Sequence, residues 1–217
     1  MDPLRVLIGY SMRSGSTLLQ HILAQHSRLR SFSDLSSNWI LLRLAAGPAP
    51  GYDVCVKPMD VFFLWSGFPI ERYFNRFVWL TRDPRDAYLS SIESGYAYLL
   101  RRPGRRRHDI DVGLLERWGR IHRRYFAQPE RWHLVRYEDL ATDPEPILED
   151  LQRYLGLTRE RLLPFRPFKL LHGGDHKLRH TATVHRKSIG RHRHCLTPEQ
   201  RTLFEELLGP QMSALGY

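Results

Sequence analysis

The sequence predicts an α/β fold in three layers, α/β/α, with a mainly parallel central sheet. Two observations carry this prediction. Apolar, β-branched runs alternate along the chain with longer segments whose apolar residues recur at helical spacing. The first such run, Leu4–Tyr10, passes through a few small residues straight into a helical pattern. No internal repeat or linker divides the 217 residues, so we expect a single domain, 1–217.

The elements follow from these patterns in chain order. Apolar runs predict four strands, at Leu4–Tyr10, Asp53–Pro58, Arg76–Arg82 and His133–Tyr137. Helical spacing and capping residues predict helices at Ser16–His26, Asn38–Ala46, Phe68–Phe74, from Asp83 onward, Val112–Phe126, Asp143–Leu155 and from Thr197 onward. Residues 27–37 and 164–194 show neither period, so we expect loops there.

The turn between the first strand and the first helix predicts a P-loop-like phosphate-binding loop. It contains Ser14, Gly15, Ser16 and Thr17, whose backbone N–H groups would converge at the positive end of the helix dipole. Gly15 lets the backbone approach an anion closely, and Arg13 adds a full charge. A Walker A loop has Lys where this chain has Ser16, so an ATP-hydrolysing function lacks its main charge neutraliser.

Composition restricts the class of partner. The formal net charge is +10, which calls for an anionic ligand. Five arginines lie in a short segment, Arg101–Arg107, that we expect to be an exposed loop, either simply solvated or acceptor-binding. No apolar run is long enough to span a membrane, and two cysteines suggest no disulfide framework. We therefore expect a cytoplasmic protein without a membrane partner.

A second anion site is predicted at the third strand. Arg82 ends that strand, on the edge where parallel sheets bind ligands, and Ser90 lies about two turns along the following helix. A guanidinium and a hydroxyl at this spacing suit a second phosphate group. The chain thus offers two anion sites at the ends of neighbouring strands.

Together these motifs resemble the PAPS-dependent sulfotransferase family, and most closely its tyrosylprotein and carbohydrate (Golgi-type) branch with its bacterial relatives. RSGSTLL (13–19) resembles the loop for the 5′-phosphosulfate, and TRDPRDAYLSS (81–91) the segment for the 3′-phosphate. The resemblance continues through RYEDL (136–140), KSIGR (187–191) and LGPQMSALGY (208–217). It implies sulfuryl transfer from PAPS to a hydroxyl or amine, with adenosine 3′,5′-bisphosphate as the other product.

The resemblance also implies roles for individual residues. The catalytic residues would be Arg13, Asp34, Lys57 and Ser188. The nucleotide would be bound by Arg13, Ser14, Gly15, Ser16, Thr17, Arg82, Ser90, Tyr137, Lys187, Ser188, Gly190 and Arg191. Asp34 falls where this branch has its carboxylate general base; a histidine base, as in the cytosolic branch, and a mere helix-capping role for Asp34 stay open. Lys57 alternatively reads as a solvated strand end, and Tyr137 as a packing residue.

Other functions are weaker alternatives. A P-loop small-molecule kinase would need the P-loop Lys and a carboxylate that ends a strand to hold Mg²⁺. A nucleic-acid binder would need its basic residues along a phosphate track, so we expect no nucleic-acid partner. We expect no metal, since Gly173 and Gly174 interrupt the helical spacing of His172, His176 and His180. The acceptor would be a small molecule, sugar or peptide; Trp39, Trp65, Phe62 and Phe63 are candidates for its pocket or for the core. The oligomeric state is not predicted.

Overall fold

A computed structural model describes residues 2–47, 50–65, 67–95, 106–166 and 183–217. Five parallel strands form the main sheet in the order β2-β3-β1-β4-β7. Their bounds are β1 Arg5–Tyr10, β2 Arg30–Ser33, β3 Val54–Lys57, β4 Arg76–Thr81 and β7 His133–Arg136. A two-stranded antiparallel ribbon pairs β5, Arg106–Arg107, with β6, Ile110–Asp111.

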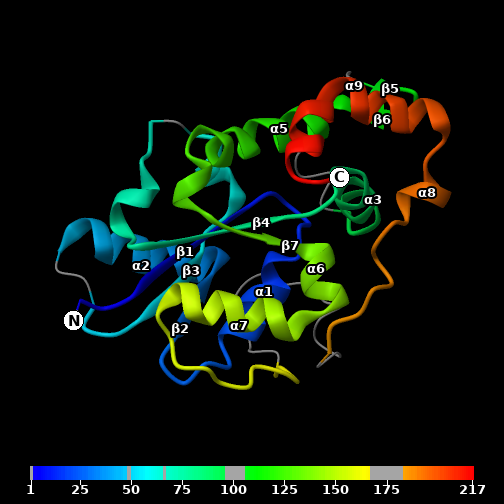
Figure 1. Ribbon diagram of the computed structural model, residues 1–217. Coiled ribbons are helices and arrows are strands. Elements are labelled where there is room, and N and C mark those ends of the chain that lie inside the picture. Colours follow the sequence, from blue (N-terminus) through cyan, green and yellow to red (C-terminus); the bar gives the residue numbers. More distant parts are fainter. Residues whose placement is uncertain (1, 48–49, 66, 96–105, 167–182) are drawn as a thin grey trace.

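Helices connect and cover the strands (Figure 1). The α-helices are α1 Ser16–Leu23, α2 Asp34–Ala46, α3 Pro84–Glu93, α5 Val112–Ala127, α6 Tyr137–Thr142, α7 Pro144–Leu155, α8 His192–Cys195 and α9 Pro198–Ala214. Short 3-10 helices are η1 Asp60–Phe63, η2 Ile70–Tyr73 and η3 Pro129–Arg131. In Figure 1, α1 and α7 lie on one side of the sheet and α5 on the other, which gives the expected three layers.

The predicted strands and most predicted helices are confirmed within a few residues, whereas several short elements were missed: β2, α6, α8, the ribbon of β5 and β6, and the 3-10 helices η1 and η3. Residues 30–37 were expected to be loop, yet β2 pairs with β3 and α2 begins at Asp34. Only Ser33 of β2 is fully buried, so this edge strand carries no apolar alternation in its sequence. α6 and α8 were not predicted because each is only a few residues long, too short to show helical spacing of apolar residues in the sequence. Of the Arg-rich segment, Arg101–Arg105 lies outside the described residues.

Two apolar clusters stabilise the fold. The larger surrounds the sheet and includes Trp79, which is fully buried on β4. Gly9 of β1 is required beside it, because a Cβ there would lie 2.4 Å from the Trp79 ring. The smaller cluster joins α3, α5 and α9 through residues such as Phe204. α3 therefore packs against two helices while its start stays at the sheet edge.

The carboxyl ends of the parallel strands meet at one edge of the sheet. Tyr10, Lys57, Thr81 and Arg136 end β1, β3, β4 and β7, respectively. Open α/β sheets bind ligands at this edge, since the loops and helix starts that follow the strands face the same side. Residues 13–17, Arg82 and Tyr137, all predicted to bind the nucleotide, follow three of these strand ends in the chain.

Candidate active site

The predicted phosphate loop adopts a conformation that Gly15 makes accessible. Gly15 has φ 89° and directly precedes α1. A Cβ at this position would lie 2.4 Å from Cδ2 of Tyr137, so the Tyr137 ring packs directly on the loop. Ser14, one of the predicted loop residues, is fully buried, and its hydroxyl donates to the Ser11 carbonyl at 2.7 Å, which closes the turn.

A cavity of about 300 Å³ opens in front of this loop. Ten of the residues predicted to bind the nucleotide line it: Arg13, Gly15, Ser16, Thr17, Arg82, Ser90, Tyr137, Lys187, Ser188 and Arg191. Leu18, Thr183, Val184 and His185 complete the lining and were not predicted. The volume lies at the lower end of the range typical of small-ligand pockets. Ser14 and Gly190 support this cavity without lining it.

Arg82 connects the phosphate loop with the segment around Ser188, two parts of the cavity wall. Its guanidinium donates to the Arg13 carbonyl at 3.0 Å and to the Ser188 carbonyl at 2.6 Å. The same group lies 4.6 Å from the centre of the Tyr137 ring. Arg82 is only 4% exposed, and its Nε is buried without a hydrogen-bond partner among the described residues. An unpaired buried donor at a cavity wall suits an anionic ligand.

The two predicted phosphate sites are in direct contact. Arg13, from the loop after β1, donates from Nε to the Ser90 hydroxyl at 3.0 Å. Ser90 lies on α3, two turns after Arg82. Arg13 has φ 64°, an uncommon conformation for a residue with a side chain. The sequence placed Arg13 and Ser90 in separate sites, and the fold brings them to one wall.

The segment from Thr183 to Arg191 forms another wall of the cavity. Ser188 Oγ lies 2.6 Å from the Tyr137 hydroxyl, and Arg191 forms an ion pair with Glu93 of α3. Asp86, a buried residue of α3, accepts hydrogen bonds from the backbone N–H groups of Gly190 and His192. Asp86 was not predicted, because an acidic residue in the first turn of a helix reads as an ordinary end-charge effect.

Lys57, which is buried, forms an ion pair with the partly exposed Asp34 beside the phosphate loop. Lys57 Nζ donates to Asp34 Oδ1 at 2.8 Å and lies 3.3 Å from the Tyr10 hydroxyl at the end of β1. Lys57 is 2% exposed, so it is not a solvated strand end. Burial lowers the pKa of Lys57, and the adjacent Asp34 carboxylate opposes this shift. The fold thus brings two of the predicted catalytic residues together.

Asp34 occupies a strained backbone position. Its φ is 48°, and it is the first residue of α2, whereas Ser33 provides the N-cap with its paired capping box. The capping role considered for Asp34 is therefore wrong. Its second oxygen, Oδ2, accepts from the Ser33 hydroxyl at 2.9 Å. Strained non-glycine residues concentrate at functional sites, where the surrounding fold holds them in place.

A second charged pair near the loop was missed. Asp60 of η1 accepts from the Met12 backbone N–H at 3.2 Å and from Arg117 of α5 at 2.7 Å. It lies two residues after Pro58 in the chain, in a segment without a motif. The Asp60 carboxylate therefore ties α5 to the start of the phosphate loop.

The four candidate acceptor aromatics divide between surface and core. Trp39 and Trp65 are 77% and 58% exposed, whereas Phe63 is 2% exposed and belongs to the main core. Phe62 is partly buried, and its ring contacts those of Trp65 and Phe68. Core packing is therefore the correct interpretation of Phe63, and only the other three have surface to offer an acceptor.

The histidines are dispersed where the structure describes them. His172, His176 and His180 lie outside the described residues. His192 is buried and lies 3.1 Å from Asp86, while His194 is exposed. No group of three or more potential metal ligands occurs among the described residues. Within that same part of the chain, no helix has the length and apolarity to cross a bilayer.

A protein-family model and several solved structures match this chain. Residues 75–161, which run from the start of β4 past α7, match the family model described as "Sulfotransferase family". Over this segment the chain is similar to the sulfotransferase family. The matched segment contains Arg82, Ser90 and Tyr137, three of the residues that line the cavity. No curated protein matches the chain significantly.

Solved sulfotransferase structures share the fold of this chain over nearly its whole length. The sulfotransferase domain from the curacin biosynthetic pathway aligns with a TM-score of 0.69 and 18% identity, covering 96% of this chain and 97% of that one. The sulfotransferase domain of the Synechococcus PCC 7002 olefin synthase gives 0.69 and 18%, covering 98% and 95%. Mouse sulfotransferase SULT7A1, complexed with PAP, gives 0.61 and 14%, covering 97% and 84%. At these identities the likeness concerns the fold.

Proposed function

We propose that this sulfotransferase moves a sulfuryl group from PAPS to a hydroxyl, or an amine, of an acceptor. The observation that carries the proposal is the cavity in which Arg13, Arg82 and Ser90 meet in front of a glycine-bearing loop at a helix N-terminus. A loop of this kind suits the 5′-phosphosulfate, and Arg82 with Ser90 suits the 3′-phosphate. The family match supports the same donor.

The proposed reaction uses two groups of residues. The acceptor oxygen attacks sulfur, the bond from sulfur to the bridging phosphate oxygen breaks, and adenosine 3′,5′-bisphosphate leaves. Asp34 accepts the proton that the acceptor loses. Arg13, Lys57 and Ser188 stabilise the charge that develops on the transferred group and on the departing oxygen.

The ion pair between Lys57 and Asp34 supports this division of roles. Lys57 orients the carboxylate from the end of β3, and its own ammonium group is buried, where a fixed charge acts strongly. Asp34 is nevertheless about one-quarter exposed in its side chain, so an acceptor can approach it. We prefer Asp34 to a histidine base because Lys57, its partner, ends the strand next to the phosphate loop.

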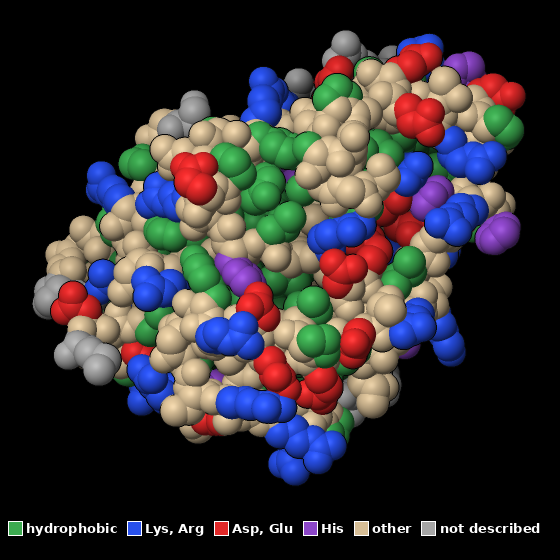
Figure 2. Space-filling view, viewed as in Figure 1, with side chains coloured by type: hydrophobic (Ala, Val, Ile, Leu, Met, Phe, Trp, Pro, Cys, Tyr) green, Lys and Arg blue, Asp and Glu red, His purple; other side chains and the backbone are tan. Residues whose placement is uncertain are grey.

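The alternatives receive no support from the site. The Lys position of a kinase loop is held by Ser16, and the Asp83 carboxylate is bound to Arg85, an ion pair at 2.7 Å. Figure 2 shows Lys and Arg spread across the visible face and interspersed with Asp and Glu. A nucleic-acid binder would be expected to gather them along one track. We also propose that the chain forms one domain and that the protein is cytoplasmic.

Two measurements test the proposed function. Incubation with sulfur-labelled PAPS and a panel of small-molecule, sugar and peptide acceptors should label at least one acceptor. Calorimetric titration should show much tighter binding of adenosine 3′,5′-bisphosphate than of adenosine 5′-phosphate, because only the former occupies both anion sites. A wild-type protein without that preference would refute PAPS as the donor.

A further inference from the structure

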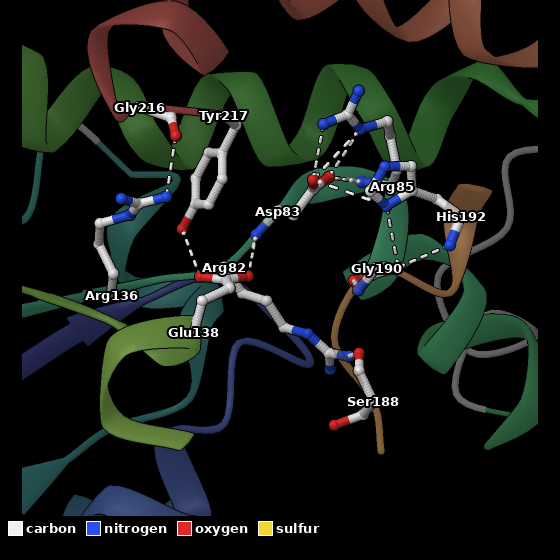
Figure 3. Close-up of polar contacts among 11 residues, drawn as sticks. Arg82, Asp83, Arg85, Arg136, Glu138, Ser188, Gly190, His192, Gly216 and Tyr217 are labelled. Atoms are coloured by element: carbon white, nitrogen blue, oxygen red, sulfur yellow. Dashed lines mark hydrogen bonds and ion pairs between the residues drawn. The ribbon is translucent and has the colours of Figure 1, made fainter. Parts of the chain in front are cut away.

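A hydrogen-bonded chain outside the cavity leads to the start of α3 (Figure 3). The Asp83 backbone N–H, directly after Arg82, donates to Glu138 Oε1 at 2.9 Å. The other oxygen of this carboxylate accepts from the Tyr217 hydroxyl at 3.1 Å. In Figure 3 the Tyr217 ring points down onto Glu138, while the Arg82 side chain leaves in the opposite direction, toward Ser188.

Tyr217 is itself fixed in place. Arg136 donates to the carbonyl of the preceding Gly216 at 2.9 Å, and its guanidinium lies 4.8 Å from the centre of the Tyr217 ring. Arg136 ends β7, the strand that pairs with β4 beside Thr81. The two neighbouring strand ends are therefore connected twice, once by the sheet and once through the segment that carries Tyr217.

The protonation states agree with this direction of donation. Burial and the negative charge of Glu138 raise the pKa of Tyr217, so the phenol keeps its proton and remains a donor. Burial also raises the pKa of Glu138, and the hydrogen bonds from Asp83 and Tyr217 oppose that shift. A buried carboxylate needs such donors, since an unsatisfied buried charge is costly.

The hydrogen-bonded path from Tyr217 through Glu138 holds the backbone next to Arg82, the residue proposed to bind the nucleotide. Arg82 makes both of its carbonyl contacts, to Arg13 and to Ser188, across the cavity, so a shift of its backbone would move both walls. The Asp83 N–H is the backbone group next to it. Fixing this peptide therefore fixes the origin of the Arg82 side chain.

We infer that Glu138 and Tyr217 are positioning residues for recognition of the 3′-phosphate, acting through the Arg82–Asp83 peptide. Neither residue lines the cavity, so their effect passes through Arg82. The inference rests on the proposed function, because it presumes that Arg82 contacts the nucleotide.

Tyr154 provides a matched control, because it makes similar hydrogen bonds at the start of β4, the strand that ends before Arg82. The Tyr154 hydroxyl, on α7, donates to the Phe77 carbonyl at 3.1 Å and accepts from the Phe77 N–H at 3.2 Å. Tyr154→Phe thus removes a partly buried tyrosine hydroxyl that holds the start of β4, whereas Tyr217→Phe removes one that holds the residues after the end of β4. Only Tyr217→Phe should affect binding of the nucleotide.

The experiment titrates adenosine 3′,5′-bisphosphate and adenosine 5′-phosphate into wild type, Tyr217→Phe, Tyr154→Phe, Glu138→Ala and the double variant Glu138→Ala/Tyr217→Phe. Tyr217→Phe should reduce the preference for the bisphosphate by about 3- to 10-fold, as expected for residues coupled in one network. Tyr154→Phe should keep the wild-type preference even where its melting temperature falls. The double variant should show no loss beyond that of Glu138→Ala, because Tyr217 acts through Glu138.

Two results would overturn the inference while leaving PAPS binding intact: an unchanged preference in Tyr217→Phe, or an equal loss in Tyr154→Phe. Glu138→Gln gives a further check, because its amide oxygen still accepts from Asp83; it should keep most of the preference that Glu138→Ala loses. Where Glu138→Ala does not fold, the comparison of the two Tyr→Phe variants decides. A wild type without preference for the bisphosphate would instead refute the proposed function.

Discussion

Lys57 Nζ lies 2.8 Å from Asp34 Oδ1, so the proposed general base and a proposed charge-stabilising residue form one ion pair. They come from different elements, the end of β3 and the first residue of α2, which the pairing of β2 with β3 brings together. Removing either side chain of such an ion pair leaves the other without its partner, so the effects of changing the two are coupled. Two predictions follow from this coupling.

Asp34→Asn should lower turnover by about 100- to 10,000-fold, the usual contribution of a positioned general base. The amide keeps the shape of the side chain and loses its basicity, so binding of adenosine 3′,5′-bisphosphate should stay near the wild-type value. Steady-state assays with PAPS and calorimetry provide the two readouts. Asp53→Asn is the control, since Asp53 also forms an ion pair, with Arg28, but lies directly before the start of β3, at the end of the strand opposite Lys57. Normal turnover in Asp34→Asn would move the base to another residue.

Lys57→Met should lower turnover by about 100-fold or more, as expected when a preorganised charge is removed from the transition state. The combined variant Asp34→Asn/Lys57→Met should be less impaired than the product of the two single effects, because each single change leaves the other partner without its ion pair. A double-mutant cycle on turnover measures this. Strictly multiplicative effects would show that the two residues act independently.

Arg82→Ala should reduce the preference for the bisphosphate over adenosine 5′-phosphate by about tenfold or more, since about 1.4 kcal/mol is a factor of ten. Truncation removes the donor to the phosphate and also releases the Arg13 and Ser188 carbonyls. Ser90→Ala should give a smaller loss, because it removes only one neutral hydroxyl. Calorimetry on the three proteins checks the order. A preference that survives in Arg82→Ala would leave the donor unchanged and place the 3′-phosphate elsewhere.

Turnover should be unaffected by excess chelator. A sulfuryl group carries fewer negative charges than a terminal phosphoryl group, so Arg13, Lys57 and the loop backbone suffice to stabilise it. The check is an assay with PAPS in the presence of EDTA, with and without added Mg²⁺. Activity that vanished with EDTA and returned only with Mg²⁺ would contradict this expectation.

The free energy of unfolding should fall as the pH drops below about 6.5, through His122. This residue is buried against Trp118, with ring centres 3.6 Å apart, and burial lowers its pKa to about 3. Between those values the unfolded chain binds a proton that the folded chain does not. The stability contribution is therefore complete above pH 6.5 and is lost toward pH 3, at about 1.4 kcal/mol per pH unit.

Urea unfolding at a series of pH values measures this slope. His122→Phe retains an aromatic ring beside Trp118 and should flatten the slope between pH 6.5 and 4. Some slope should remain, because burial also lowers the pKa of His21 to about 4. Identical slopes in wild type and variant would exclude His122 as the titrating group.

The sequence by itself determined the alternation of strands and helices, the phosphate loop and the two motifs around Arg13 and Arg82. These depend on local physics: apolar periodicity, a glycine at the turn, and a Pro after a capping Asp. The edge strand β2 escaped prediction because its stability comes from pairing with β3 rather than from its own apolar residues. Short segments such as α6 are likewise decided by what they pack against.

Which side chains meet depends on the tertiary fold. The pairing of Lys57 with Asp34, the bond between Arg13 and Ser90, and the path from Tyr217 through Glu138 to Asp83 join residues far apart in the chain. No local pattern marks Tyr217 or Asp86, since a tyrosine or an aspartate has the same propensity whether it faces water or a partner. Their partners are set by the parallel sheet, which brings successive strand ends to one edge and the loops that follow them into contact.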